Sequence, residues 1–409
     1  RQHAPHFQAV AQVGLAGLDQ HLEHGALPFG PPAGPQGHCG AHPAGRGVGD
    51  NPVPMDIADI RHRLQALGAG PLHVQRVLRT WANALPVDGG RRKPEHHFPR
   101  SLFEALPAVT QELQGLATLG SVHPGEDGSA RLLVALRDGQ TVESVLLPRG
   151  GVCVSTQVGC AVGCTFCMTG TGGLIRQLGS AEIVAQVALA RQQRSVNKVV
   201  FMGMGEPAHN LEAVLEAIDL LGTLGNIGHK NLVFSTVGDE RAFDALPRGR
   251  VKPALALSLH TTRADLRAQL LPRAPRITPD ELVAHGEAYA RTTGYPVQVQ
   301  WTLLDGVNDT DEELDGIVRL LQGKYAVLNM IPYNAVPGLP FERPSWEKAA
   351  DIARRLHRRG ILTKLRQSAG QDVDAGCGQL RARSLASGEQ VVSVRRRRLS
   401  AASADTTSS

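Results

Sequence analysis

The chain has 409 residues, of which 42% are hydrophobic, so it can bury a large core and is not an intrinsically disordered protein. No apolar run reaches the roughly 18 residues that a membrane span needs, and no basic start precedes an apolar run, as it would in a signal peptide. Six cysteines in such a chain predict a reducing, cytoplasmic location. The net charge of +5 and the pI near 9.0 favour an anionic partner.

Neither end of the chain has the composition of a folded domain. Residues 1–54 are rich in Gly, Pro and His and precede the first methionine, Met55. We therefore interpret 1–54 as a disordered or mistranslated upstream segment, with the native start at Met55. A peptide from 1–54 in the natural protein would refute this hypothesis. The tail, 383–409, is polar and basic, and we expect it to be disordered.

Helical spacing of apolar residues follows the upstream segment, over 56–82 and again over 102–116. This pattern predicts a small helical accessory domain over 55–125. A basic group lies between the two helical stretches and consists of Arg91, Arg92, Lys93, His96, His97 and Arg100. It is either a solvated loop or a surface that contacts the phosphates of RNA.

From residue 126 the pattern changes to strands. Alternating apolar residues on both sides of Asp138-Gly139 predict a hairpin over 131–147. Short apolar runs then alternate with helical patterns, which predicts a parallel sheet with crossover helices and a partial or full barrel. The expected strands are 152–158, 198–202, 232–236, 254–259, 297–303, 327–331 and 362–365. The expected helices are 181–194, 211–221, 279–292, 312–321 and 347–358.

Three cysteines, Cys160, Cys164 and Cys167, follow the first of these strands in a CxxxCxxC spacing. A zinc knot would need a fourth ligand close by, but the nearest downstream histidine is His209 and the next cysteine is Cys377. A redox CxxC pair would leave Cys160 without a role. Three thiolates on one loop favour an iron–sulfur cluster with one open iron, where a ligand can bind and react. The spacing is also that of the radical S-adenosylmethionine (SAM) enzymes.

Five motifs in order carry a resemblance to a known family. They are Val154–Cys160, Met202–Pro207, Ser258–His260, Ile331–Asn334 and Asp372–Leu380. Together they resemble the RlmN/Cfr family of radical SAM RNA methyltransferases over residues 130–382. The resemblance implies an α/β fold in which a radical SAM partial (β/α)6 barrel over 126–382 follows the helical accessory domain.

The resemblance also implies the cofactors and the residues that hold them. A [4Fe-4S] cluster would be bound by Cys160, Cys164 and Cys167, and SAM would bind at its open iron. The matching SAM contacts are Gly205, Glu206, Ser235, Ser258, Leu259, His260 and Asn334. A glycine lets the backbone approach a ligand closely, and a carboxylate pairs with an ammonium group. Outside this family, Gly205-Glu206 would be an ordinary turn and His260 a core histidine.

The chemistry implied by the resemblance uses two further cysteines and a glutamate. Cys377 accepts a methyl group from one SAM, because a thiolate attacks a sulfonium methyl readily. A radical from a second SAM removes a hydrogen from that methyl, and the resulting carbon radical adds to a ring carbon of adenine, C2 being expected. Glu143 is the proton acceptor, and Cys153 then releases the RNA and leaves a transient disulfide. Otherwise both cysteines would be buried free thiols and Glu143 a surface residue of a strand.

The implied partners are rRNA or tRNA and an electron donor such as flavodoxin, with no membrane, and the protein is expected to be a monomer. Residues 167–176 and 55–125 depart from the usual family pattern, which leaves open the RNA target and the choice between C2 and C8. Two alternatives remain. One is a radical SAM enzyme with a non-RNA substrate such as a protein, and the other is a non-catalytic, metal-stabilised RNA-binding protein.

Overall fold

The computed structural model describes residues 54–87, 94–336 and 338–381, all within one compact unit. The expected tail, nearly all of the expected upstream segment and the basic residues Arg91–Lys93 lie outside these ranges. No helix in the described ranges is long and apolar enough to cross a membrane.

Three helices precede the sheet: α1 (Ile57–Ala66), α2 (Pro71–Ala82) and α3 (Arg100–Gly115). Proline at the first position of α2 costs no hydrogen bond, because that N–H has no partner within a helix. The apolar faces of these helices pack into the same hydrophobic core as the sheet. The start of α1 is also tied to the start of α4 (Ser180–Gln193), since the Ser180 backbone N–H donates to Asp56 Oδ1 at 2.7 Å. A role of this region in RNA binding stays a prediction.

The central sheet has ten strands in the order β1-β2-β3-β4-β7-β8-β9-β10-β11-β12. The first four pair antiparallel, and the pairs from β4 to β12 are all parallel. Their bounds are β1 (Ala117–Pro124), β2 (Ala130–Leu136), β3 (Thr141–Leu147), β4 (Gly151–Cys153), β7 (Lys198–Phe201), β8 (Leu232–Thr236), β9 (Ala254–Ser258), β10 (Val297–Leu303), β11 (Ala326–Pro332) and β12 (Thr363–Leu365). The predicted hairpin is confirmed as β2–β3, where Gly139 has a φ of 81°.

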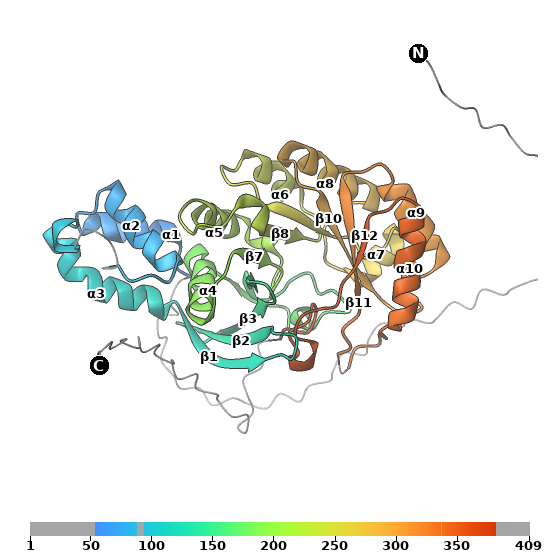
Figure 1. Ribbon diagram of the computed structural model, residues 1–409, viewed down its shortest axis with the longest axis horizontal. Coiled ribbons are helices and arrows are strands. Elements are labelled where there is room, and N and C mark those ends of the chain that lie inside the picture. Colours follow the sequence, from blue (N-terminus) through green and yellow to red (C-terminus); the bar gives the residue numbers. More distant parts are fainter. Residues whose placement is uncertain (1–53, 88–93, 337, 382–409) are drawn as a thin grey trace, which may run out of the picture. The chain divides into compact units, whose positions relative to one another are not determined.

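Helices connect the parallel strands and lie in an arc around them (Figure 1). They are α4, α5 (Leu211–Thr223), α6 (Glu240–Ala245), α7 (Ala264–Leu270), α8 (Pro279–Thr293), α9 (Asp311–Leu321) and α10 (Trp346–Arg358). Short 3-10 turns are η1 (Pro94–His96), η2 (Met168–Gly170), η3 (Pro207–Asn210), η4 (His229–Asn231), η5 (Leu246–Arg248) and η6 (Gln371–Val373). Each pair of successive parallel strands is thus joined by a crossover that contains a helix, as a (β/α)6 arrangement requires.

The parallel sheet curves back toward itself. Lys198 on β7 interacts electrostatically with Lys364 on β12, although four strands separate β7 from β12 in the sheet order. Within the described residues β1 and β12 each end the sheet, so the barrel is partial. This confirms the predicted α/β fold class.

Two strand predictions were incomplete. The strand β1 was missed because a bulge between Leu119 and Ser121 breaks its apolar alternation. The expected strand 152–158 is divided, since Ser155 donates its backbone N–H to Gln186 Oε1 at 2.9 Å instead of to a neighbouring strand. Its second half, β5 (Gln157–Gly159), pairs antiparallel with β6 (Leu174–Gln177) in a separate two-stranded sheet.

Candidate active site

The three cysteines lie on the loop that joins β5 to β6, beyond the carboxyl end of β4. Gly159 allows this hairpin to close, because a Cβ there would lie 2.0 Å from the Gly173 carbonyl oxygen and its φ is 79°. The segment around α7 anchors the loop from the other side, where the Thr165 N–H donates to the Leu270 carbonyl at 3.0 Å. The Met168 N–H donates to the Gly378 carbonyl at 2.8 Å, which ties the loop to the chain's last described segment.

The three thiols share one apolar pocket. Burial raises the pKa of Cys160 to about 11. Burial also raises the pKa of Cys164, and the nearby thiols Cys167 and Cys160 raise it further. Such thiols become ligands when a metal centre stabilises the thiolate. Within the described residues, no three Cys, His, Asp or Glu side chains converge tightly enough to hold a single metal ion. A donor set of three soft thiols and no fourth fits a multi-iron cluster with one open position.

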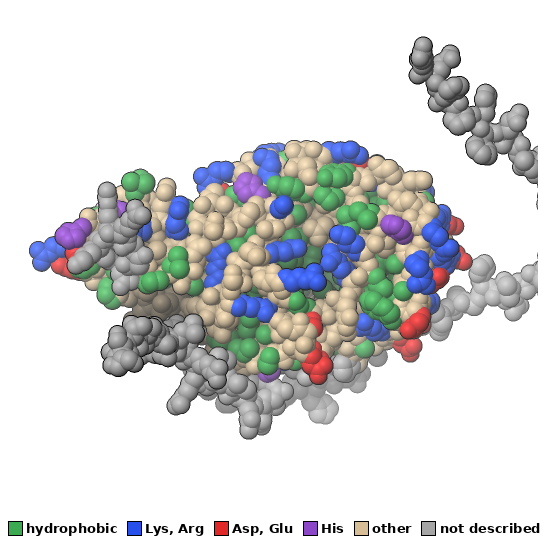
Figure 2. Space-filling view, viewed as in Figure 1, with side chains coloured by type: hydrophobic (Ala, Val, Ile, Leu, Met, Phe, Trp, Pro, Cys, Tyr) green, Lys and Arg blue, Asp and Glu red, His purple; other side chains and the backbone are tan. Residues whose placement is uncertain are grey.

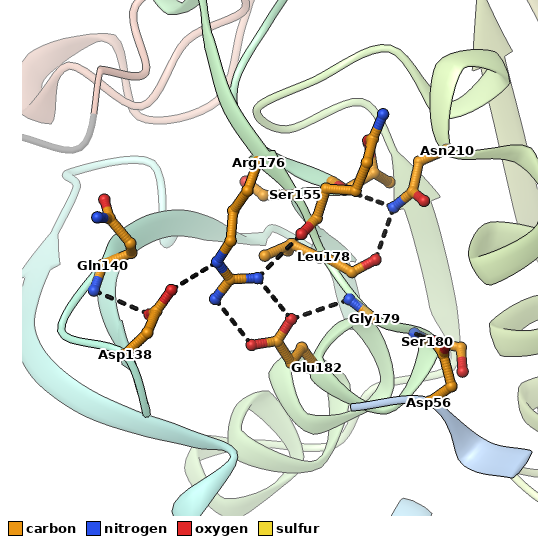
Figure 3. A network of polar contacts seen from close by, with 12 residues as sticks. Asp56, Asp138, Gln140, Ser155, Arg176, Leu178, Gly179, Ser180, Glu182 and Asn210 are labelled. Atoms are coloured by element: carbon orange, nitrogen blue, oxygen red, sulfur yellow. Dashed lines mark hydrogen bonds and ion pairs between the residues drawn. The ribbon is translucent and has the colours of Figure 1, made fainter. Parts of the chain in front are cut away.

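Arg176 on β6 fixes the far side of this hairpin (Figure 3). Its guanidinium donates to both carboxylate oxygens of Glu182 on α4, each at 2.9 Å, and to Asp138 Oδ2 in the β2–β3 turn at 2.5 Å. Glu182 also accepts from the Gly179 N–H at 2.9 Å. One cation thus joins the cysteine hairpin to a helix and to the antiparallel part of the sheet.

Replacing Arg176 with methionine is expected to lower the free energy of unfolding by about 3 kcal/mol, because two largely buried carboxylates lose their partner. Urea unfolding of the apoprotein measures this. The control is Arg250→Met, which breaks the solvent-exposed pair with Asp219 and should lower the free energy of unfolding far less, because water screens that pair. Equal losses in the two variants would contradict the assigned role of Arg176.

Gly205 and Glu206 follow β7 and face the cysteine loop. A Cβ on Gly205, whose φ is 105°, would lie 2.7 Å from the Gln157 side chain, so only glycine fits. The Glu206 carboxylate is buried and accepts from the N–H groups of Ala208 at 3.1 Å and Val237 at 3.0 Å. Burial raises its pKa to about 7. A cationic ligand beside Glu206 would stabilise its charged form, which fits the ammonium group of SAM.

The other predicted SAM contacts lie at the ends of neighbouring parallel strands. Ser235 is near the end of β8, and Ser258 ends β9, followed by Leu259 and His260. His260 has a φ of 63°, accepts from the Thr302 N–H through Nδ1 at 3.0 Å, and packs edge-on against Phe166 of the cysteine loop. Burial lowers its pKa to about 3, so the ring is neutral.

Asn334, after β11, contacts the other end of the site. Its side-chain amide donates to the Cys377 carbonyl at 3.0 Å and to Ser368 Oγ at 2.9 Å. Gly376 permits this contact, because a Cβ there would lie 2.7 Å from Asn334 Nδ2. Asn334 therefore positions the segment that carries Cys377.

Cys377 and Cys153 lie close enough to interact electrostatically, although they are 224 positions apart in the sequence. Desolvation and then the charge of Cys377 raise the pKa of Cys153, at the end of β4, to about 12. Packing around its sulfur and then Cys167 raise the pKa of Cys377, although the residue as a whole is exposed to solvent. Cys377 therefore lies between the cysteine loop and Cys153. Both are free thiols, so the expected disulfide is not present in the structure.

Glu143 on β3 is fully buried, and its carboxylate accepts hydrogen bonds from two partners. Arg131 on β2 donates to Oε1 at 2.7 Å, and the Arg381 backbone N–H donates to Oε2 at 3.0 Å. Because Arg381 lies four residues after Cys377, Glu143 helps to hold the Cys377 segment. The contact with Arg131 was not predicted, but the hairpin register places Arg131 diagonally across from Glu143, on the same face, and this could have indicated it.

Sequence reasoning also missed Arg267 on α7. Its buried guanidinium donates to the carbonyls of Leu259 at 2.7 Å and Ser258 at 2.9 Å, and to that of Val237. Desolvation lowers its pKa to about 10, while Cys164 and Glu206 favour its charge. It has no carboxylate partner among the described ion pairs. Burying such a cation destabilises the fold unless the surrounding site carries a negative charge.

Comparison with known proteins agrees with this arrangement. Residues 154–321 match the radical SAM superfamily. A crystal structure of a radical SAM methyltransferase from Sphaerobacter thermophilus superposes with a TM-score of 0.71 and 36% identity, over 80% of this chain and 98% of that one. The fold and the site thus define a radical SAM protein.

Two relatives narrow the family further. A probable RNA methyltransferase of Leptothrix cholodnii is 71% identical over 341 residues, which is 83% of this chain and 98% of the relative. One from Methylibium petroleiphilum is 74% identical over 331 residues, which is 81% of this chain and 94% of the relative. The chain belongs to the radical SAM methyltransferase family of these proteins.

Proposed function

We propose that this protein methylates a ring carbon of an adenosine in RNA, as members of the RlmN/Cfr family do, with C2 as the expected position. The observation that carries the proposal is the convergence of Cys377 and Cys153 beside the cysteine loop. A radical SAM enzyme that only abstracts a hydrogen has no need of two additional thiols at its site. The relatives named as probable RNA methyltransferases support RNA as the substrate.

We assign the binding of the cluster, of SAM and of the methyl group to different residues of the site. Cys160, Cys164 and Cys167 would hold a [4Fe-4S] cluster, which supplies the electron that cleaves SAM. Glu206 and the strand-end residues Ser235, Ser258, Leu259, His260 and Asn334, together with Gly205, form the SAM site. Cys377 carries the methyl group as a thioether. Its solvent exposure suits this role, because the thiol has to reach both SAM and a large RNA.

Two residues would complete the reaction. Glu143 accepts the proton that the adenine ring must lose after a carbon adds to it, and it is held for this by Arg131. Cys153 would attack the Cys377 sulfur, so that a disulfide forms as the bond from that sulfur to the transferred carbon breaks; the electron pair goes to that carbon, which takes up a proton and becomes the methyl group of the released RNA. The Cys153 pKa of about 12 means that it reacts slowly as a free thiol, and release then depends on removal of its proton at the site. The expected setting is the cytoplasm, with a monomeric protein and an electron donor such as flavodoxin.

The test uses anaerobically purified protein with a reconstituted cluster, SAM, a reductant and total bacterial RNA. After digestion, mass spectrometry of the nucleosides should find a new methyladenosine, and its retention time separates C2 from C8. Cleavage of SAM without any methylated nucleoside would instead favour a non-RNA substrate. Bound zinc and no consumption of SAM would favour the non-catalytic RNA-binding alternative.

The positive charge of Arg267 should raise the midpoint potential of the proposed cluster. Removing a positive charge disfavours the more negative, reduced cluster, so Arg267→Gln is expected to lower its midpoint potential by tens of millivolts. Redox titration followed by electron paramagnetic resonance measures this. Arg267→Lys keeps the charge and should recover much of the shift. An unchanged potential in Arg267→Gln would leave Arg267 with a purely structural role.

A further inference from the structure

Three cations lie on the inner face of the curved sheet, away from the helices. Lys198 begins β7 and shares its face with Val200, which packs in a small inner cluster with Val233, Ala254 and Ala256. Val199 and Phe201, on the opposite face of β7, belong to the main core. Alternation along a strand therefore places Lys198 on the inner side.

The same argument places Lys364 of β12. It pairs in register with Asn329, whereas its neighbour Thr363 pairs with Leu328, which belongs to the main core under the helices. Arg366 follows two residues later, and its Nε donates to Asn329 Oδ1 at 3.0 Å. Both Lys364 and Arg366 are exposed, so a large ligand can reach them.

Lys198 lies within electrostatic range of Lys364 and Arg366 across the hollow of the sheet. Desolvation is the largest cause that lowers the pKa of Lys198, and Arg366 and Lys364 lower it further. None of the three takes part in an ion pair with a described residue, whereas the surface arginines Arg319 on α9 and Arg354 and Arg355 on α10 do. Figure 2 shows Lys and Arg side chains gathered around a hollow in the middle of one face, where Figure 1 places β7, β10 and β12.

Like charges that face one another without counterions destabilise a fold. We propose that Lys198, Lys364 and Arg366 form a phosphate site that takes the sugar–phosphate backbone of the RNA substrate. The proposal rests on the proposed function for the identity of its ligand. A phosphodiester supplies the missing negative charge, and the forked guanidinium and the two ammonium groups can contact its oxygens together. Bases would not be recognised here, so the site would contribute affinity without sequence preference.

The test compares wild type with Lys198→Gln/Lys364→Gln for binding of a fluorescein-labelled RNA hairpin with an adenosine in its loop, over a series of salt concentrations. We expect the affinity to fall about tenfold or more, and the slope of log affinity against log salt to become shallower by about 1.5, because two phosphate contacts are lost. The single variant Lys364→Gln, at an exposed position, should show part of both effects. The matched control is Lys324→Gln, which removes an equal charge that pairs with Glu287 on α8.

The melting temperature of the double variant should not fall, because a repulsion is removed. Equal affinity and equal slope in wild type and double variant would overturn the proposal. It would also be overturned if inorganic phosphate raised the melting temperature of wild type alone while RNA affinity stayed the same, because the site would then take a small anion. Failure of the proposed function is distinguishable, since wild type would then methylate no RNA at all.

Discussion

Cys377→Ala protein should bind its cluster and cleave SAM but fail to methylate RNA, with a loss of about 1,000-fold or more. Cys377 is the only exposed residue among the described cysteines, and the neighbouring thiol of Cys153 is less exposed and has a pKa raised to about 12, so it does not replace Cys377 as the methyl acceptor. Its backbone carbonyl, not its side chain, accepts from Asn334, so the substitution leaves the segment anchored. Nucleoside mass spectrometry measures methylation, and chromatography of 5′-deoxyadenosine measures SAM cleavage.

The control for this prediction is Cys153→Ala. It keeps the carrier thiol, so RNA should be modified once and then stay attached to the protein, visible as a shifted band in a denaturing gel. If Cys377→Ala methylates RNA at the wild-type rate, the thioether route is wrong. If the two variants give identical products, the division of roles between the two cysteines is wrong.

Loss of one cysteine of the loop is expected to abolish iron binding. Cys164→Ala is expected to lose nearly all bound iron and, with it, SAM cleavage, because two thiols and an apolar pocket cannot hold a cluster that already lacks a fourth protein ligand. Iron analysis and the visible absorbance of the reconstituted protein measure this. Cys153→Ala removes a thiol from the same site and should retain its iron, which separates ligand loss from general damage. Full iron content in Cys164→Ala would exclude Cys164 as a ligand.

The parallel part of the fold was predictable because its strands are short buried runs. The expected strands 232–236 and 297–303 match β8 and β10 at both ends, and the helix expected over 279–292 matches α8 to one residue. Thr278 caps α8 by accepting from the Glu281 N–H at 3.2 Å, a pattern visible in the sequence. The local sequence is thus nearly sufficient to predict β8, β10 and α8.

Other features depend on contacts that no local pattern contains. The break after Cys153 arises because Gln186, on a distant helix, both accepts from the Ser155 N–H and donates to the Ser155 carbonyl. Arg267 resembles any helix arginine in the sequence, and only the fold places it against Leu259 and beneath the cysteine loop. The site residues of the motifs could be predicted from the family resemblance, whereas the residues that position them could not.

The chain's last described segment has a consequence for how the protein is made. Gly378 and Leu380 accept from Met168 and Thr169 beside the cysteine loop, and Arg381 donates its N–H to Glu143. The ribosome synthesises all of the barrel before it reaches this segment, and elements nearer the N-terminus fold first. A chain truncated before this segment would therefore contain the cysteine loop and the proposed SAM contacts up to Asn334 but lack the proposed methyl carrier, Cys377. The site that we propose is therefore assembled only after the strands of the barrel have been synthesised, because Cys377 comes later in the chain than all of them.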